Sequence, residues 1–230
     1  MPAPRNGRAT EERMFSAIVD AILDQRLAPG TKLKERELGE IFGASRASVR
    51  TVLGRLGHSL LVELRPNRGA IIANPSVQET RDLLEARRML ESALVQRLAR
   101  TLGAKDIAAL RRFVAEEKRA YDRGNLKKGK RLSIRFHKLL SEAAGNATLD
   151  RFMEHLICRT PLLGNGGNGS SHAYCGADEH GEIVEAIARR DGAGAARRMS
   201  EHLSHLEQAL LHEDTPSVKS VGEALRAEVN

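Results

Sequence analysis

The sequence predicts a mostly α-helical protein of two domains, an N-terminal winged helix-turn-helix at residues 1–75 and a C-terminal all-α six-helix bundle at residues 76–213. Two observations lead to this prediction. Before residue 75, a helix, a tight turn and a helix are followed by two short strands, whereas after it apolar residues recur with a helical period. The segment Asn74-Pro75-Ser76 separates the two patterns, so we place the domain boundary there.

In the N-terminal domain, each predicted element follows from spacing and turn chemistry. Pro29-Gly30 ends the first helix, Ser45 can cap the third, and residues 65–69 supply the turn of the wing hairpin. The third helix has apolar residues at i, i+3, i+4 and i+7, starting from Val49. The predicted elements are helices at 11–26, 35–42 and 46–57, and strands at 60–63 and 70–72.

In the C-terminal domain, apolar residues recur with a 3.6-residue period in six segments. The predicted helices lie at 77–102, 105–122, 126–145, 147–159, 178–190 and 193–212. Residues 163–176 are rich in Gly, Asn and Ser and are expected to form a loop, and the tail at 214–230 has too little apolar content to anchor firmly.

Composition limits the function classes. The net charge of +7 makes a polyanionic partner plausible without identifying it, and the absence of Trp argues against single-strand binding by stacked rings. Cys158 and Cys175 are too few for a disulfide framework or a zinc ribbon. No apolar run is long enough to span a membrane, and residues 1–10 lack the apolar core of a signal peptide. We therefore expect a cytoplasmic protein.

The exposed face of the third helix suits the major groove of duplex DNA. A helical wheel places the small residues Ala47, Thr51 and Gly54 between Arg50 and Arg55. The sequence between Glu40 and Glu63 contains no acidic residue that would repel phosphates. The alternative is a small protein-interaction module whose arginines are merely solvated.

Several ordered sequence blocks stand out in the first third of the chain. They are Pro29-Gly30-Thr31-Lys32-Leu33, Glu35-Arg36-Glu37-Leu38, the run from Ser45 to Leu56, and Asn67-Arg68-Gly69. Together these blocks resemble the winged-helix domain of GntR-type regulators, with the last of them at the wing tip. The resemblance implies DNA contacts by Arg36, Ser45, Arg46, Ser48, Arg50, Arg68 and Gly69. One departure is the segment 57–61, where the family usually has an acidic residue and then Gly-Leu.

The remainder resembles the all-helical effector domain of the FadR-like branch of that family, called FCD, and six helices favour its shorter, VanR-like form. The resemblance rests on the segment 85–91, on Phe136-His137 with Gly145-Asn146, on Glu179-His180 ahead of Glu185-Ala186-Ile187, on Arg190-Asp191, and on Met199 with His202-Leu203.

The resemblance implies a metal site and a ligand pocket. In many such domains one Asp and three His hold a divalent metal that a small carboxylate effector also binds. His137, His180 and His202 match, but Ser133 stands where the aspartate would be. Two interpretations therefore stand side by side. Either the three imidazoles bind zinc or nickel, or the pocket is free of metal and its histidines bind an effector directly.

Arg87, Ser133 and His137 are the expected effector-binding residues. A surface ion pair between Arg87 and Glu91 is the alternative for Arg87, and Arg135 is a further pocket candidate.

These inferences together predict a ligand-responsive transcriptional regulator. We expect a homodimer that binds double-stranded operator DNA as a repressor and is released by a small organic acid. We do not expect an enzyme: the segment 164–169 fits G-x-G-x-x-G but lacks a surrounding βαβ pattern, and no G-x-S-x-G or H-E-x-x-H motif occurs. The alternatives are a metal-dependent helical enzyme and a nonspecific architectural DNA-binding protein.

Overall fold

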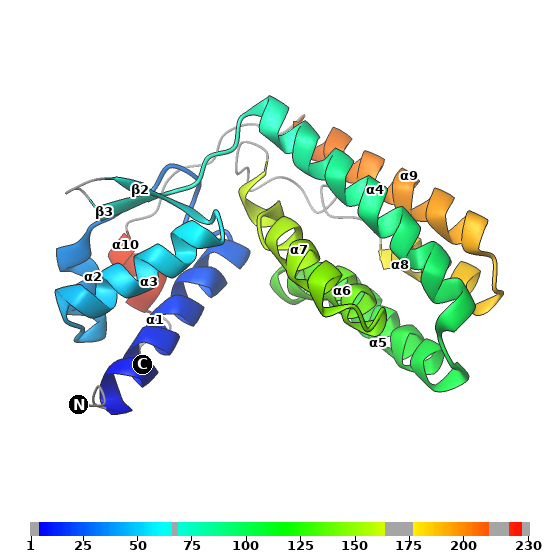
Figure 1. The fold of residues 1–230 in the computed structure, drawn as a ribbon, viewed down its shortest axis with the longest axis horizontal. Coiled ribbons are helices and arrows are strands. Elements are labelled where there is room, and N and C mark those ends of the chain that lie inside the picture. Colours follow the sequence, from blue (N-terminus) through cyan, green and yellow to red (C-terminus); the bar gives the residue numbers. More distant parts are fainter. Residues whose placement is uncertain (1–4, 66–68, 164–176, 212–220, 227–230) are drawn as a thin grey trace. The chain divides into compact units, whose positions relative to one another are not determined.

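The computed structural model describes residues 5–65, 69–163, 177–211 and 221–226 (Figure 1). Its chain divides into two compact units. One comprises Met1–Pro75, Pro161–Gly167 and Thr215–Asn230, and the other comprises Ser76–Thr160 and Asn168–Asp214.

The N-terminal unit is a three-helix domain with a small antiparallel sheet. Its elements are α1 (Arg5–Leu23), β1 (Lys32–Leu33), α2 (Glu35–Phe42), α3 (Arg46–His58), β2 (Val62–Arg65) and β3 (Gly69–Ile72). The strands lie in the order β1-β3-β2, with Leu33 opposite Ala70 and Val62 opposite Ile72. The core is apolar because α1, α2 and α3 each turn one buried stripe inward, represented by Ile18, Leu38 and Val52.

Three details of this unit differ from the sequence prediction. Helix α1 begins at Arg5 and ends at Leu23, rather than spanning residues 11–26. Strand β1 was not expected, because two residues are too short to show a period-2 pattern. Strand β2 begins at Val62 rather than residue 60, because Leu60 has a φ of 56° in the left-handed region. Leucine rarely adopts this conformation, which puts its Cβ close to a carbonyl oxygen. This is the segment where the sequence departs from the family pattern.

The C-terminal unit contains the six predicted helices within the part of the chain that is described. They are α4 (Val77–Thr101), α5 (Ala104–Asp122), α6 (Leu126–Ala143), α7 (Ala147–Ile157), α8 (Ala177–Ala188) and α9 (Gly192–Leu211). A short 3₁₀ turn, Thr160–Leu162, follows α7 in the chain, where the assignment changes from one unit to the other. Helix α4 packs along α9, and α5 packs against α6 and α8 (Figure 1). The predicted fold class, mostly α with a winged helix-turn-helix and a helical bundle, is confirmed.

The C-terminal tail differs from the expectation of a flexible segment at one place. Residues Val221–Arg226 form a short helix, α10, which packs on α1 and α2 (Figure 1). Val221, Ala224 and Leu225 are buried there, and the Arg26 guanidinium donates a hydrogen bond to the carbonyl of Ala224. A few apolar residues suffice because they complete a core that α1 and α2 have already formed.

Two sequence predictions lie outside the described residues. They are the loop predicted at residues 163–176, of which only Leu163 is described, and the position of Arg68 at the wing tip. Within the described helices, none combines the length and the hydropathy that crossing a bilayer requires.

Candidate functional site

Helix α3 presents a small-residue face between arginines. The Ser45 side chain caps the helix by accepting a hydrogen bond from the backbone N–H of Ser48 at 3.2 Å. Val49, Val52, Leu53 and Leu56 are buried, which leaves Ala47, Thr51, Gly54, Arg46 and Arg50 exposed. The sequence-predicted contacts Arg36, Ser45, Arg46, Ser48 and Arg50 therefore all lie on α2, α3 or the turn between them.

The arginines of this surface differ in how firmly they are held. Arg50 pairs with Glu35 at 3.2 Å and Arg36 with Glu40 at 3.0 Å, whereas Arg46 makes no ion pair within the described part of the chain. Exposed ion pairs of this kind contribute about 0–1 kcal/mol, so phosphate groups can replace the carboxylates at little cost.

Arg55 has a different environment from the one that the helical wheel suggested. It forms two hydrogen bonds to Glu12 on α1, at 2.9 and 3.1 Å, and its guanidinium lies 4.4 Å from the centre of the Phe15 ring. This geometry links α3 to α1 and holds the side chain against the domain.

Gly69 begins strand β3 in a conformation that requires glycine. Its φ is +83°, and a Cβ atom there would lie 2.3 Å from the carbonyl oxygen of Leu33. The conformation of Gly69 thus brings β1 and β3 together at the base of the wing.

The second site is a cluster of three buried histidines from three helices. His137 lies on α6, His180 on α8 and His202 on α9. The Nε2 atom of His202 lies 3.2 Å from Nε2 of His180 and 3.3 Å from Nε2 of His137. One ligand atom from each of the three rings lies within 4.8 Å of the other two.

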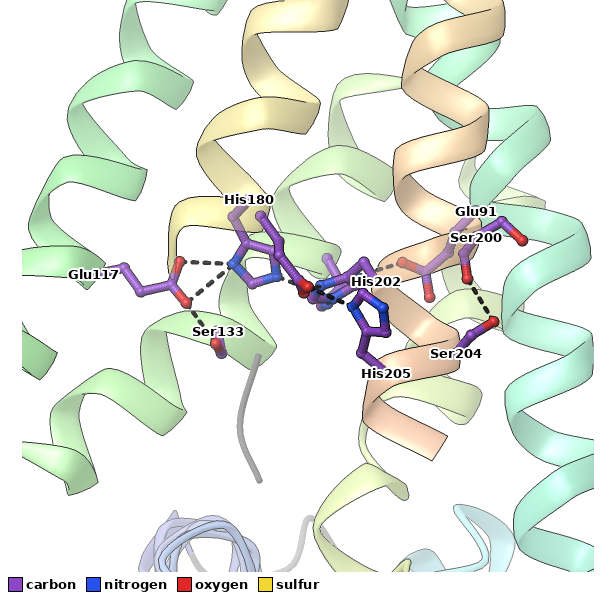
Figure 2. A network of polar contacts seen from close by, with 10 residues as sticks. Glu91, Glu117, Ser133, His180, Ser200, His202, Ser204 and His205 are labelled. Atoms are coloured by element: carbon purple, nitrogen blue, oxygen red, sulfur yellow. Dashed lines mark hydrogen bonds and ion pairs between the residues drawn. The ribbon is translucent and has the colours of Figure 1, made fainter. Parts of the chain in front are cut away.

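Each ring directs its other nitrogen to a carboxylate. The Nδ1 atom of His180 donates to Glu117 at 2.8 Å (Figure 2), that of His137 donates to Glu91, and that of His202 donates to Glu179 at 2.9 Å. A proton on every Nδ1 leaves three Nε2 lone pairs facing one another, which cannot form hydrogen bonds among themselves.

Burial keeps two of these rings neutral at pH 7. It lowers the pKa of His137 to about 3 and, with a contribution from His180, that of His202 to about 4. The pKa of Glu179 is lowered to about 2, mainly because its carboxylate accepts a hydrogen bond from His202. Neutral imidazoles with converging lone pairs are the form that binds metal ions.

The donor set fits a divalent metal ion. Two nitrogen ligands of a tetrahedral zinc ion, each about 2.0–2.1 Å from the metal, lie about 3.3 Å apart, close to the two shorter separations in the cluster. The carboxylates on the Nδ1 atoms match the usual surroundings of metal-bound histidines. The structure thus shows three buried histidines that could hold a metal ion.

A small cavity adjoins the cluster. Its volume is about 10 Å³, and it is lined by Arg87, Ser133, Ile134, His137, Ile157, Thr160 and Leu206. The predicted effector residues Arg87, Ser133 and His137 therefore share one cavity. It is about large enough for one water molecule.

Arg87 is buried, paired and only partly satisfied. Its Nε donates to Glu91 at 2.6 Å and its Nη1 to Thr160 at 2.9 Å, whereas Nη2 has no hydrogen-bond partner. The ion pair between Arg87 and Glu91, which was the alternative interpretation of Arg87 from the sequence, does form, but it is buried rather than on the surface. The guanidinium of Arg87 and His137 together hold the pKa of Glu91 well below its usual range, although burial alone would raise it.

Arg135, a sequence candidate for the pocket, does not line the cavity. It instead pairs with Glu142 on the surface.

Sequence reasoning missed the three carboxylates Glu91, Glu117 and Glu179 as partners of the histidines. Only the position of Glu179 next to His180 carried a signal, and its actual partners are His202 and His205.

Fold and sites define a DNA-binding protein of the winged-helix class joined to a helical domain with a buried polar centre. Residues 10–72 match "Bacterial regulatory proteins, gntR family", and residues 82–205 match "FCD domain". The chain belongs to the GntR family of transcriptional regulators, in the group that carries an FCD domain. The resemblance noted in the sequence is confirmed.

Similar proteins cover most of the chain. The HTH-type transcriptional repressor RspR of Escherichia coli K12 is 26% identical over 80% of this chain and 81% of its own, and LutR of Bacillus subtilis is 26% identical over 82% and 95%. Among solved structures, E. coli McbR/YncC has a TM-score of 0.73 at 17% identity, covering 87% of this chain and 96% of that one. This last likeness concerns the fold.

Proposed function

We propose that the protein is a ligand-responsive repressor that binds operator DNA as a homodimer and is released by a small organic acid. Residues 1–75 would bind the DNA, and residues 76–213 would bind the effector and form the dimer. The observation that carries the effector part is the buried Arg87, whose Nη2 has no partner and which lines a cavity beside a histidine cluster.

The chemistry of the cavity favours a carboxylate. A buried guanidinium nitrogen without a partner is costly, and an anionic oxygen would satisfy it with a charge-assisted hydrogen bond. The apolar wall of Ile134, Ile157 and Leu206 suits a short aliphatic part of the same molecule. The ligand class is therefore a small aliphatic acid.

Entry of such a ligand requires rearrangement. A cavity with room for one water cannot hold an organic acid, so Ile157, Thr160 or Leu206 must move when it binds. We infer that this displacement is the conformational change that alters DNA affinity. A ligand changes that affinity only as far as it binds the two states differently.

Zinc or nickel bound by His137, His180 and His202 belongs to the same proposal. The metal would supply a Lewis-acidic position facing the cavity, while Arg87 orients the carboxylate. His137 lines both the cluster and the cavity, so it connects the two.

On the DNA side, we place α3 in the major groove. The proposed DNA contacts are Arg36, Ser45, Arg46, Ser48, Arg50, Arg68 and Gly69. The name of the relative RspR, a repressor, supports the direction of regulation. An architectural DNA-binding protein would not need a buried ligand centre, and the regulatory families matched favour regulation over catalysis.

The test measures DNA affinity by fluorescence anisotropy on the intergenic DNA upstream of the protein's own gene, against random DNA at the same salt concentration. A panel of two- to six-carbon acids is added, with and without zinc. We expect one acid to weaken operator binding in wild type and to have no effect on Arg87→Met, measured at a temperature at which circular dichroism shows that this variant is folded. By linkage, operator DNA should weaken binding of that acid by the same factor. Equal affinity for both DNAs, or no response to any acid that binds, would refute the proposal.

A further inference from the structure

Glu117 on α5 is a buried carboxylate without an arginine or lysine partner among the described residues. Its side chain is fully buried, and the hydrogen bonds that it forms there are with the Ser133 hydroxyl and with Nδ1 of His180, the latter at 2.8 and 3.0 Å (Figure 2). Glu91, by contrast, has the Arg87 guanidinium beside it. No lysine or arginine of the described chain pairs with Glu117.

This arrangement favours a positive charge near Glu117. Its hydrogen-bond partners are a hydroxyl and an imidazole nitrogen, neither of which carries a fixed charge, whereas buried carboxylates are usually paired with a cation or held near a metal. The opposite edge of the His180 ring faces the cluster, where its Nε2 lies 3.2 Å from Nε2 of His202. A cation bound at the cluster would polarise the His180 ring and balance Glu117 through it.

The charge of the surrounding residues points the same way. Glu91 and Glu117 each accept a hydrogen bond from one histidine and Glu179 from two, whereas the only arginine bonded to any of these three carboxylates among the described residues is Arg87. Carboxylates thus outnumber arginines around the three histidines, and this favours a bound cation.

We propose that Glu117 is a positioning residue of the metal centre, which holds His180 with its Nε2 lone pair toward the ion and supplies the negative charge that an all-imidazole ligand set lacks. This inference rests on the metal part of the proposed function. The hydroxyl of Ser133 donates to one Glu117 oxygen and so fixes the carboxylate against the His180 ring.

The contact between Ser133 and Glu117 makes the two positions interdependent. An aspartate at position 133 would place a second carboxylate against Glu117, and like charges at that distance repel each other. With a neutral glutamine at position 117, the same aspartate would no longer be repelled and could bind the ion itself. The two substitutions should therefore compensate each other.

The experiment measures Zn²⁺ affinity by competition with a chromophoric chelator, without any organic acid present. The four proteins are wild type, Glu117→Gln, Ser133→Asp and the double variant. We expect Glu117→Gln to weaken Zn²⁺ binding by about 10- to 100-fold, as for other groups that orient metal-bound histidines. Ser133→Asp alone should give no gain, and the double variant should recover most of the loss. A purely structural role for Glu117 would not produce this recovery.

Controls keep the result interpretable. Glu116→Gln, at an exposed residue of α5 that pairs with Lys128, should leave Zn²⁺ affinity unchanged. Should Glu117→Gln fail to fold by circular dichroism, Ser133→Ala replaces it and should weaken binding several-fold. Three results would overturn the inference. The first is that the wild type binds no Zn²⁺, and the second is that Glu117→Gln or its replacement binds Zn²⁺ with unchanged affinity. The third is that Ser133→Asp binds Zn²⁺ more tightly while Glu117 is still present. Operator binding is measured separately, so failure here leaves the DNA-binding proposal standing.

Discussion

Breaking the buried pair between Arg87 and Glu91 should destabilise the helical domain far more when one partner is removed than when both are. Both side chains are 1% exposed and lie 2.6 Å apart. Removing one partner of such a pair leaves an uncompensated buried charge and costs about 3–5 kcal/mol. Arg87→Met and Glu91→Gln should each show this loss. The double variant leaves no unpaired charge and keeps an acceptor for His137, so we expect it to lose about 1–2 kcal/mol.

Tyrosine fluorescence is a suitable signal for urea unfolding of these variants. The chain has no Trp, and its two tyrosines, Tyr121 and Tyr174, both fall within residues 76–213. The signal therefore follows the helical domain, and EDTA removes any contribution from metal. The control is Glu142→Gln, which breaks the exposed pair with Arg135 and should change stability by less than about 1 kcal/mol. Additive losses in the double variant would show that the buried pair is not the source of the effect.

Three further changes test the N-terminal unit. Leu60→Gly should raise the stability of this unit by about 0.5–1 kcal/mol, because glycine adopts the left-handed backbone conformation of residue 60 without strain. Leu64→Gly, in strand β2, should lower it. Thermal melts that rank the two variants the other way would contradict this. Arg46→Ala should weaken operator binding by about 1–3 kcal/mol, and Arg111→Ala, which removes the same charge from α5, should not; equal effects would mean that only net charge matters. Leu225→Ala should destabilise the unit by about 2–5 kcal/mol in denaturation, and no change would mean that α10 is not docked in solution.

Helices and their order could be predicted because amphipathic periodicity is local. The six helices α4 to α9 all lie within a few residues of their predicted bounds, since each buries one stripe along its length. Strand β1 could not be predicted, because Lys32 and Leu33 are extended only through pairing with Ile71 and Ala70. The helix α10 likewise forms on a surface that α1 and α2 provide.

The site was predictable only in part. The three histidines were found through family resemblance, since His137 lies far from His180 and His202 in the sequence. Nothing in the sequence paired two of their carboxylate partners with them: Glu117 is 63 residues from His180, and Glu91 is 46 residues from His137. Only the packing of α4, α5, α6, α8 and α9 brings these residues together. A helical wheel also cannot show that Arg55 is held by Glu12, because that residue lies on another helix.

The docking of α10 on α1 and α2 has a consequence for synthesis of the chain. Domains generally fold as they leave the ribosome, beginning at the N-terminus. Here the residues that cover part of the first domain, Val221, Ala224 and Leu225, follow the whole helical domain in the chain and are translated after it. A nascent DNA-binding domain thus keeps an uncovered apolar patch until the helical domain has been synthesised. Chains truncated before α10 would carry that patch permanently, and aggregation or proteolysis would remove them preferentially over chains that contain α10.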